Sequence, residues 1–82
     1  MNIFVGNLNF KVSDSELESL FEDYGQVSSA KIITDKYSGR SRGFGFVEME
    51  DSTEAKNAIE GLNGSSFGGR DIVVNEAKPR TS

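Results

Sequence analysis

Three phenylalanines stand in two runs of β-forming residues. Phe4 lies in the run 2–8, and Phe44 and Phe46 lie in the run 43–50. Successive side chains of a strand point to opposite faces, so Phe44 and Phe46 share one face if their run is a strand. Rings that are left uncovered on such a face form an apolar patch, which a monomeric protein rarely leaves bare unless it binds a partner there.

The alternation of residue types indicates which side chains face inward. In the run 43–50, Val47 and Met49 are ordinary core residues, whereas Glu48 must meet solvent. Phe44 and Phe46 share the parity of Glu48, so we expect them on the outer face. The same argument places Phe4, Lys31, Ile33, Val73 and Asn75 outward, opposite Ile3, Val5, Ala30, Ile32, Ile72 and Val74.

Capping residues and hydrophobic spacing predict the elements that position these rings. One helix begins after Ser13, which forms a capping box with Glu16, and Gly25 is expected to end it in the left-handed conformation. A second helix begins after Asp51 and ends at Asn63-Gly64. Strands are predicted over residues 2–8, 27–34, 43–50 and 71–77, with a polar loop over 35–42 and a turn with a short hairpin over 65–69.

This order of elements predicts an α+β fold, the ferredoxin-like βαββαβ sandwich with a four-stranded antiparallel sheet. Right-handed crossovers place both helices on one face of that sheet. In a chain of 82 residues nothing is left to cover the other face. We assign residues 1–78 to this one domain and residues 79–82 to a short polar C-terminal tail.

Composition excludes several kinds of chemistry. The sequence has no Cys and no His, which excludes disulfides, zinc sites of the Cys/His type and catalysis by an imidazole base. We expect no cofactor and no metal. The sequence also shows neither a signal peptide nor an apolar stretch near 18 residues, which predicts a cytoplasmic protein without a membrane partner, and we expect a monomer.

The charge of the chain needs to be divided by segment. A net charge of −4 argues at first against a partner that carries phosphates. However, residues 13–24 hold five acidic and no basic side chains, whereas residues 31–42 hold four basic side chains and one acidic. The negative charge therefore belongs mainly to the predicted helices, and a basic surplus borders the open face of the sheet.

The segments Ile3–Leu8 and Arg42–Met49 resemble the two ribonucleoprotein motifs of the RNA recognition motif family. The longer motif matches the family pattern except at Met49, where the family has an aromatic residue. Parity places Met49 on the core side, so this departure concerns packing. The resemblance extends over about residues 2–77. Within the family, the chain is similar to small bacterial members and to the RNA-binding part of glycine-rich RNA-binding proteins. It implies single-stranded RNA, or single-stranded DNA, as the partner.

The resemblance implies a role for each matching residue. Phe4 and Phe46 would each stack on a base. Phe44 would pack against sugars, and Arg42 would pair with a phosphate. Asn7 is expected to hold the turn after the first strand. Further RNA-binding candidates on the sheet, in the 35–42 loop and at the C-terminal end are Lys31, Asn75, Lys78, Lys36 and Arg40.

Two other functions are compatible with the same topology. A protein-interaction module would bind peptides through its helical face, although here that face is acidic and the aromatic motifs are intact. A small acylphosphatase needs an Arg and an Asn that converge on a phosphate, and Arg42 and Asn7 are available, but no glycine-bearing phosphate loop follows the first strand. We therefore predict a non-enzymatic domain that binds RNA in post-transcriptional regulation or as an RNA chaperone.

Overall fold

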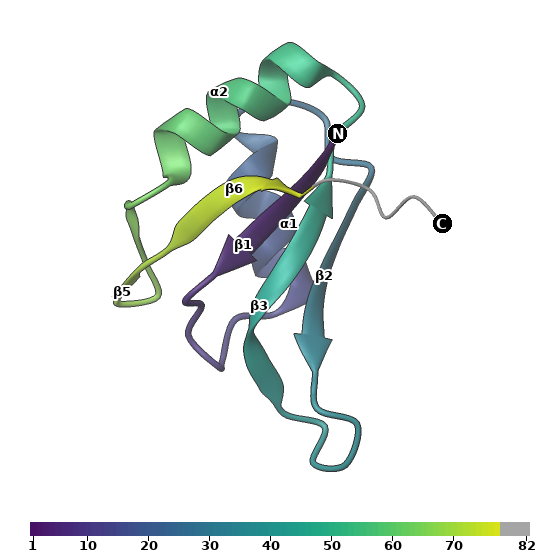
Figure 1. The fold of residues 1–82 in the computed structure, drawn as a ribbon, viewed down its shortest axis with the longest axis vertical. Helices are drawn as coiled ribbons and strands as arrows, with labels where there is room; N and C mark the ends of the chain where they lie inside the picture. The colour runs from purple at the N-terminus through teal and green to yellow at the C-terminus, as the bar shows by residue number, and fades with distance from the viewer. Residues whose placement is uncertain (78–82) are drawn as a thin grey trace.

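Residues 1–77, which the computed structural model describes, form a four-stranded antiparallel sheet and two helices (Figure 1). The strand order β2-β3-β1-β6 places the two strands with the aromatic residues at the centre. The elements are β1 (Asn2–Gly6), α1 (Asp14–Glu22), β2 (Ser29–Thr34), β3 (Ser41–Glu48), α2 (Ser52–Leu62), β4 (Ser66–Phe67), β5 (Arg70–Asp71) and β6 (Val73–Ala77). The predicted α+β fold is confirmed.

In Figure 1 helix α1 lies behind the sheet and α2 runs next to β6 at the top of the view, and the buried residues of both helices belong to one core. Helix α1 packs against β2 and β3, and α2 packs against β6. The side chains predicted to face inward form the core beneath them, and Met49 is fully buried there. The opposite parity is left on the open face, as the alternation predicted. Within the described residues, neither helix is long and apolar enough to span a bilayer.

The helix starts follow the predicted capping residues. The Ser13 hydroxyl accepts from the Glu16 backbone N–H at 3.2 Å, and the Glu16 carboxylate accepts from the Ser13 N–H at 3.2 Å. The Asp51 carboxylate accepts from the Glu54 N–H at 3.0 Å. These bonds satisfy N–H groups that have no partner within the helix, and they fix where each helix starts relative to the sheet.

The prediction for Gly25 is wrong. Helix α1 ends at Glu22, its cap Asp23 is right-handed, and Gly25 is not among the residues with positive φ. A Cβ at Gly25 would instead meet the side chain of Glu54 in the first turn of α2. The glycine is therefore needed because two elements approach closely, and a local helix-stop pattern carries no information about that contact.

The strand boundaries also differ from the prediction. Strand β2 begins at Ser29, two residues later than expected, and β3 begins at Ser41, inside the predicted loop, because Ser41 pairs with Thr34. The last strand begins at Val73. Ile72 exchanges backbone hydrogen bonds with Gly64 and Ser65 and so does not pair in the main sheet. The segment before it forms β5, which pairs with β4 as the predicted short hairpin.

Candidate nucleic-acid interface

The open face of the sheet carries a row of four side chains, one from each strand. Lys31 of β2 pairs with Phe46 of β3, Phe46 pairs with Phe4 of β1, and Phe4 pairs with Asn75 of β6. Directly paired residues in an antiparallel sheet point to the same face, so the four side chains stand side by side. The register thus brings together four residues that are separated by as many as 71 positions in the sequence, from Phe4 to Asn75.

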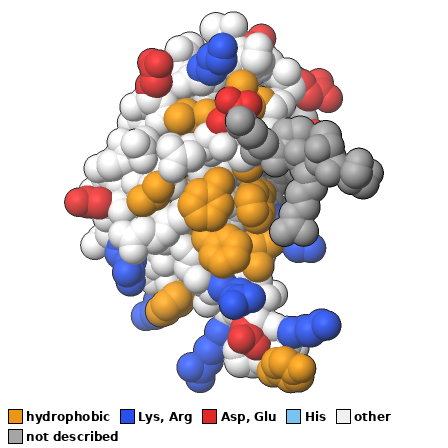
Figure 2. Space-filling view, viewed as in Figure 1, with side chains coloured by type: hydrophobic (Ala, Val, Ile, Leu, Met, Phe, Trp, Pro, Cys, Tyr) orange, Lys and Arg blue, Asp and Glu red, His pale blue; other side chains and the backbone are white. Residues whose placement is uncertain are grey.

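The three phenylalanine rings form one cluster at the centre of this face. The ring centroid of Phe4 lies 5.9 Å from those of Phe44 and Phe46, and the latter two are 6.2 Å apart. Phe46 is 40% exposed, and Phe4 and Phe44 are half-buried. Figure 2 shows the apolar side chains gathered at the middle of the face. Phe46 meets the other two rings edge-on, at 64° and 88°, whereas Phe4 and Phe44 are tilted by 33° to each other.

Two glycines in the central strands allow close packing around the rings. The ring of Phe4 lies over Gly6, where an added Cβ would come within 2.8 Å of Phe4 Cε2. At Gly45 a Cβ would come within 2.5 Å of the backbone carbonyl oxygen of Lys31. Gly6 therefore leaves room for a ring on the open face, whereas Gly45 allows β2 and β3 to approach closely.

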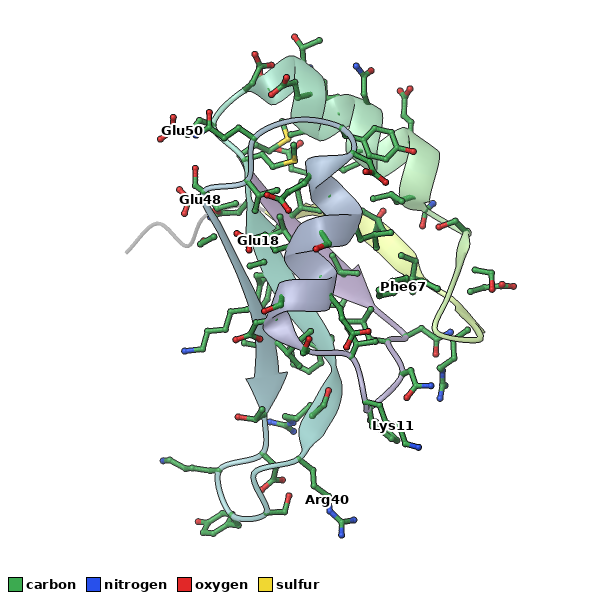
Figure 3. All side chains as sticks on the ribbon, turned by 180° about the vertical axis from the view of Figure 1, so that it is seen from behind. Lys11, Glu18, Arg40, Glu48, Glu50 and Phe67 are labelled. Carbon is green, nitrogen blue, oxygen red and sulfur yellow. The ribbon has the colours of Figure 1, made fainter. Side chains whose placement is uncertain are left out.

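The basic candidates border the cluster at one end. Arg42 lies in β3 and is exposed, at the edge of a pocket that Phe44 also lines. Lys36 and Arg40 are exposed in the loop between β2 and β3, which extends beyond the sheet and away from the rings (Figures 1 and 3). Lys78 lies outside the described residues. In Figure 2 the basic side chains gather around this lower end, and most acidic ones lie toward the opposite end.

The loop between β2 and β3 is held by Asp35. Its carboxylate accepts from the backbone N–H of Tyr37 at 2.7 Å and of Ser38 at 3.1 Å. These two hydrogen bonds, and to a lesser extent the charge of Arg42, hold the pKa of the Asp35 carboxyl below its ordinary value. The loop that carries Lys36 and Arg40 thus has an ordered base.

Asn7 and Arg70 form a link at the end of β1 that the sequence did not reveal. Asn7 adopts a left-handed φ of 57°, and its Nδ2 donates to the Asp71 carbonyl at 2.7 Å, in agreement with its expected structural role. The Arg70 guanidinium donates to Asn7 Oδ1 at 2.9 Å. Arg70, which directly precedes the predicted last strand, lies in β5 and lines the same pocket as Arg42.

Phe10 was also missed. It lies in the loop between β1 and α1 and is 65% exposed, next to the pocket that contains Arg42 and Arg70. The available signal was an aromatic residue in the polar run Asn9-Phe10-Lys11, where no helical or strand periodicity would bury it. Among the described residues, no group of three acidic side chains is arranged to hold a metal ion.

Comparisons with known proteins agree with this geometry. The family model described as the RNA recognition motif matches residues 3–73. RbpA of Synechocystis sp. is 50% identical over 80 residues, which make up 98% of this chain and 79% of that protein. The glycine-rich RNA-binding protein GRP1A of Sinapis alba is 52% identical over 79 residues, or 96% of this chain and 48% of that protein. The chain thus spans about half the length of that plant relative.

Solved structures are similar over the whole fold. The crystal structure of the RNA-binding protein PG1 has a TM-score of 0.95 and 54% identity, and the match covers 100% of this chain and 99% of that one. The Sxl-lethal protein–RNA complex has a TM-score of 0.90 and 30% identity, covering 98% of this chain and 48% of that one. The matched family is one of RNA-binding domains rather than enzymes, in agreement with the predicted class. The chain belongs to the RNA recognition motif family.

Proposed function

We propose that this protein binds single-stranded RNA on the open face of its sheet. The observation that carries the proposal is the row of Lys31, Phe46, Phe4 and Asn75, in which two rings from adjacent strands lie between two polar side chains. Single-stranded RNA offers unstacked bases, which stack on aromatic rings and present their edges for hydrogen bonding. The Sxl-lethal complex, a relative with the same fold, was solved with RNA.

Each residue at the interface has a distinct role in this proposal. Phe4 and Phe46 each stack on one base, and Phe44 packs against the sugars between them. Lys31 and Asn75, at the two ends of the row, hydrogen-bond to base edges. The candidates that contact phosphates at the basic end and along the C-terminal segment are Arg42, Arg40, Lys36 and Lys78.

The distribution of charge supports a partner without paired bases. Acidic side chains lie mainly on the helices and at their ends. Apolar side chains rather than cations occupy the centre of the open face (Figure 2). Stacking on a protein ring requires a base that is not stacked within a nucleic-acid duplex, whereas binding to a duplex relies on phosphate contacts. Every base has a π-face, so single-stranded DNA is included in the proposed partner class.

We further propose that residues 1–78 act as one RNA-binding unit, with 79–82 as a short tail, and that the unit is a cytoplasmic monomer. A monomer leaves the ring cluster free for RNA. Sedimentation equilibrium with and without an eight-nucleotide RNA would report a mass of one chain in each case, increased by one RNA in the second. A dimer that dissociates when RNA is added would contradict the monomer.

Fluorescence anisotropy tests the proposed function directly. The probe is a labelled eight-nucleotide single-stranded RNA of randomised sequence, titrated with the wild-type chain and with the Phe4→Leu/Phe46→Leu double variant. Leucine keeps an apolar side chain but has no π-face, so each lost stack weakens binding by about 1–3 kcal/mol. The matched control is Phe67→Leu, because Phe67 lies beside α1 on the helix side (Figure 3).

The expected result is a large loss of affinity in the double variant and none in the control. Thermal unfolding of all three proteins shows whether they are folded at the temperature of the titration. Equal RNA binding by the double variant and the wild-type chain would contradict the sheet mechanism. Loss of binding in Phe67→Leu alone would instead indicate an interface on the helix side.

A further inference from the structure

Phe10 separates two hollows at the basic end of the sheet. The first, of about 300 Å³, is lined by Phe10 together with Phe44, Arg42 and Arg70. The second, of about 500 Å³, lies between Phe10 and the segment Gly39–Ser41, where the loop between β2 and β3 leads into β3. We propose that Phe10 is a further base-stacking platform, which extends the interface by one nucleotide beyond Phe44. This inference rests on the proposed function and adds a subsite to it.

The Phe10 ring is open to solvent and lies close to the backbone of β3 at Gly43. It is 65% exposed, yet its Cε1 atom lies where a Cβ on Gly43 would be only 3.3 Å away. Gly43 has a φ of 83°, a conformation that favours glycine. The same glycine thus permits the positive φ and leaves space for the Phe10 ring. One edge of the ring therefore lies close to the backbone of β3 at Gly43, while the rest is available to a ligand.

The loop that carries Phe10 is fixed on both sides. Before it, the buried Leu8 donates its backbone N–H to the Gly43 carbonyl at 2.8 Å. The Asn9 side chain donates to the Gly68 carbonyl at 2.9 Å and accepts from the Lys11 N–H at 2.9 Å. An aromatic side chain on such a backbone loses little conformational freedom when it binds, which makes it an efficient contact.

The first hollow is continuous with the ring cluster. Phe4 and Phe44 line it from one side and Phe10 from the other, so a strand that leaves Phe44 enters the hollow directly. Its volume is at the lower end of the range of small-molecule sites. The space is therefore suited to one nucleotide at a time, with its base against Phe10.

Three arginines surround Phe10 and match the charge of an RNA backbone. Arg42 and Arg70 line the first hollow, and Arg40 lines the second. The Arg70 guanidinium is oriented by its hydrogen bond to Asn7 Oδ1. Guanidinium groups bind phosphates through paired N–H donors, so these residues can hold the phosphates on either side of a base stacked on Phe10.

Tryptophan fluorescence can detect a base on Phe10, because the chain contains no Trp. Three single variants each carry one indole: Phe10→Trp at the new subsite, Phe46→Trp in the row, and Phe67→Trp on the helix side. Each is titrated with the eight-nucleotide randomised single-stranded RNA. We expect quenching in Phe10→Trp and Phe46→Trp with the same midpoint, and an unchanged signal in Phe67→Trp.

The outcomes separate this inference from the proposed function. Quenching in Phe46→Trp without quenching in Phe10→Trp overturns the subsite and leaves the row of the sheet in place. Absence of quenching in both, with no change in RNA anisotropy, overturns the subsite and the proposed function together.

Affinity gives a second measurement. Phe10→Leu is expected to weaken binding of the eight-nucleotide RNA by about fivefold or more, which corresponds to loss of one stacked base. A dinucleotide has only two bases, which stack on the two rings of the row and leave none for Phe10. It is therefore expected to bind Phe10→Leu and the wild-type chain equally. Equal binding of the longer RNA by both proteins would overturn the subsite. Thermal unfolding should change little, because the ring is mostly exposed.

Discussion

Phe4 and Phe46 are directly paired across β1 and β3, and their rings meet edge-on at 64° with centroids 5.9 Å apart. Among residues 1–77, no other element covers the face on which this pair lies, and the apolar core is on the opposite side of the sheet. The two strands therefore carry core residues on one side and the rings of the proposed interface on the other.

Because the core and the proposed interface lie on opposite faces of the sheet, substitutions can affect stability and RNA binding separately. Phe21→Ala removes a fully buried ring and is expected to lower the free energy of unfolding by about 3–5 kcal/mol. Phe46→Ala removes a ring that is 40% exposed and should cost less than half of that, while it weakens RNA binding strongly. Urea unfolding and anisotropy on the same samples measure both effects. A cost for Phe46→Ala equal to that for Phe21→Ala would indicate a structural ring.

The dependence of binding on salt should be shallow. With two or three phosphate contacts, the slope of log K against log salt concentration is expected to be about −1.4 to −2.1. Arg42→Gln should make the slope less negative by about 0.7, since it removes one contact. Lys56→Gln, an exposed position on α2, is the matched control and should leave the slope unchanged. A slope that implies eight or more contacts would contradict an interface based on stacking.

Alanine at the two strand glycines should have opposite consequences. At Gly45 the new Cβ meets the carbonyl of Lys31, which is backbone and cannot move without disturbing the β2–β3 pairing. We expect Gly45→Ala to lower the free energy of unfolding by about 1–3 kcal/mol. At Gly6 the Cβ meets only the ring of Phe4, which can turn aside. Gly6→Ala should therefore remain stable but bind RNA more weakly.

Urea unfolding and RNA titration of both glycine variants check this expectation. Heteronuclear NMR spectra would show displacement of the Phe4 ring in Gly6→Ala as chemical-shift changes centred on β1 and its neighbours. Unchanged RNA affinity in Gly6→Ala would show that the ring position is not critical for binding.

The loop between β2 and β3 should respond to acid. The pKa of Asp35 is lowered by its hydrogen bonds from the Tyr37 and Ser38 N–H groups. A lowered pKa means that the stabilisation is fully present above the ordinary aspartate pKa, about 3.9, and is lost as the pH falls through the lower folded value. The amide proton shifts of Tyr37 and Ser38 should follow this transition. In Asp35→Asn the transition should be absent, and a midpoint at or above 3.9 in the wild-type chain would contradict the assignment.

Much of the fold could be predicted because its signals are local. The alternation in β3 separates Val47 and Met49 from Phe44 and Phe46 within a few residues, and the capping box of Ser13 and Glu16 spans one turn. Strand order and the handedness of crossovers then leave one face of the sheet open. Parity and the expected order of the strands together place the three rings and their polar neighbours on that face.

What the sequence could not supply depends on contacts between distant segments. The close approach of Gly25 to Glu54, and the breaking of the last strand at Ile72, each depend on how one element packs against another. Gly25 is indistinguishable in sequence from a glycine that ends a helix, and only the packing of α2 shows that it is needed for space.

At the basic end of the interface, some features follow from the sequence and others only from the tertiary structure. The sequence by itself determined that three rings share an uncovered face, because side-chain direction in a strand is fixed every two residues. Only the tertiary structure decided that Arg70 lies beside Phe44 and Phe10, through a hydrogen bond to Asn7 that spans 63 positions. No periodicity encodes such a contact, because it arises where a loop, a strand end and a short hairpin meet in the folded protein.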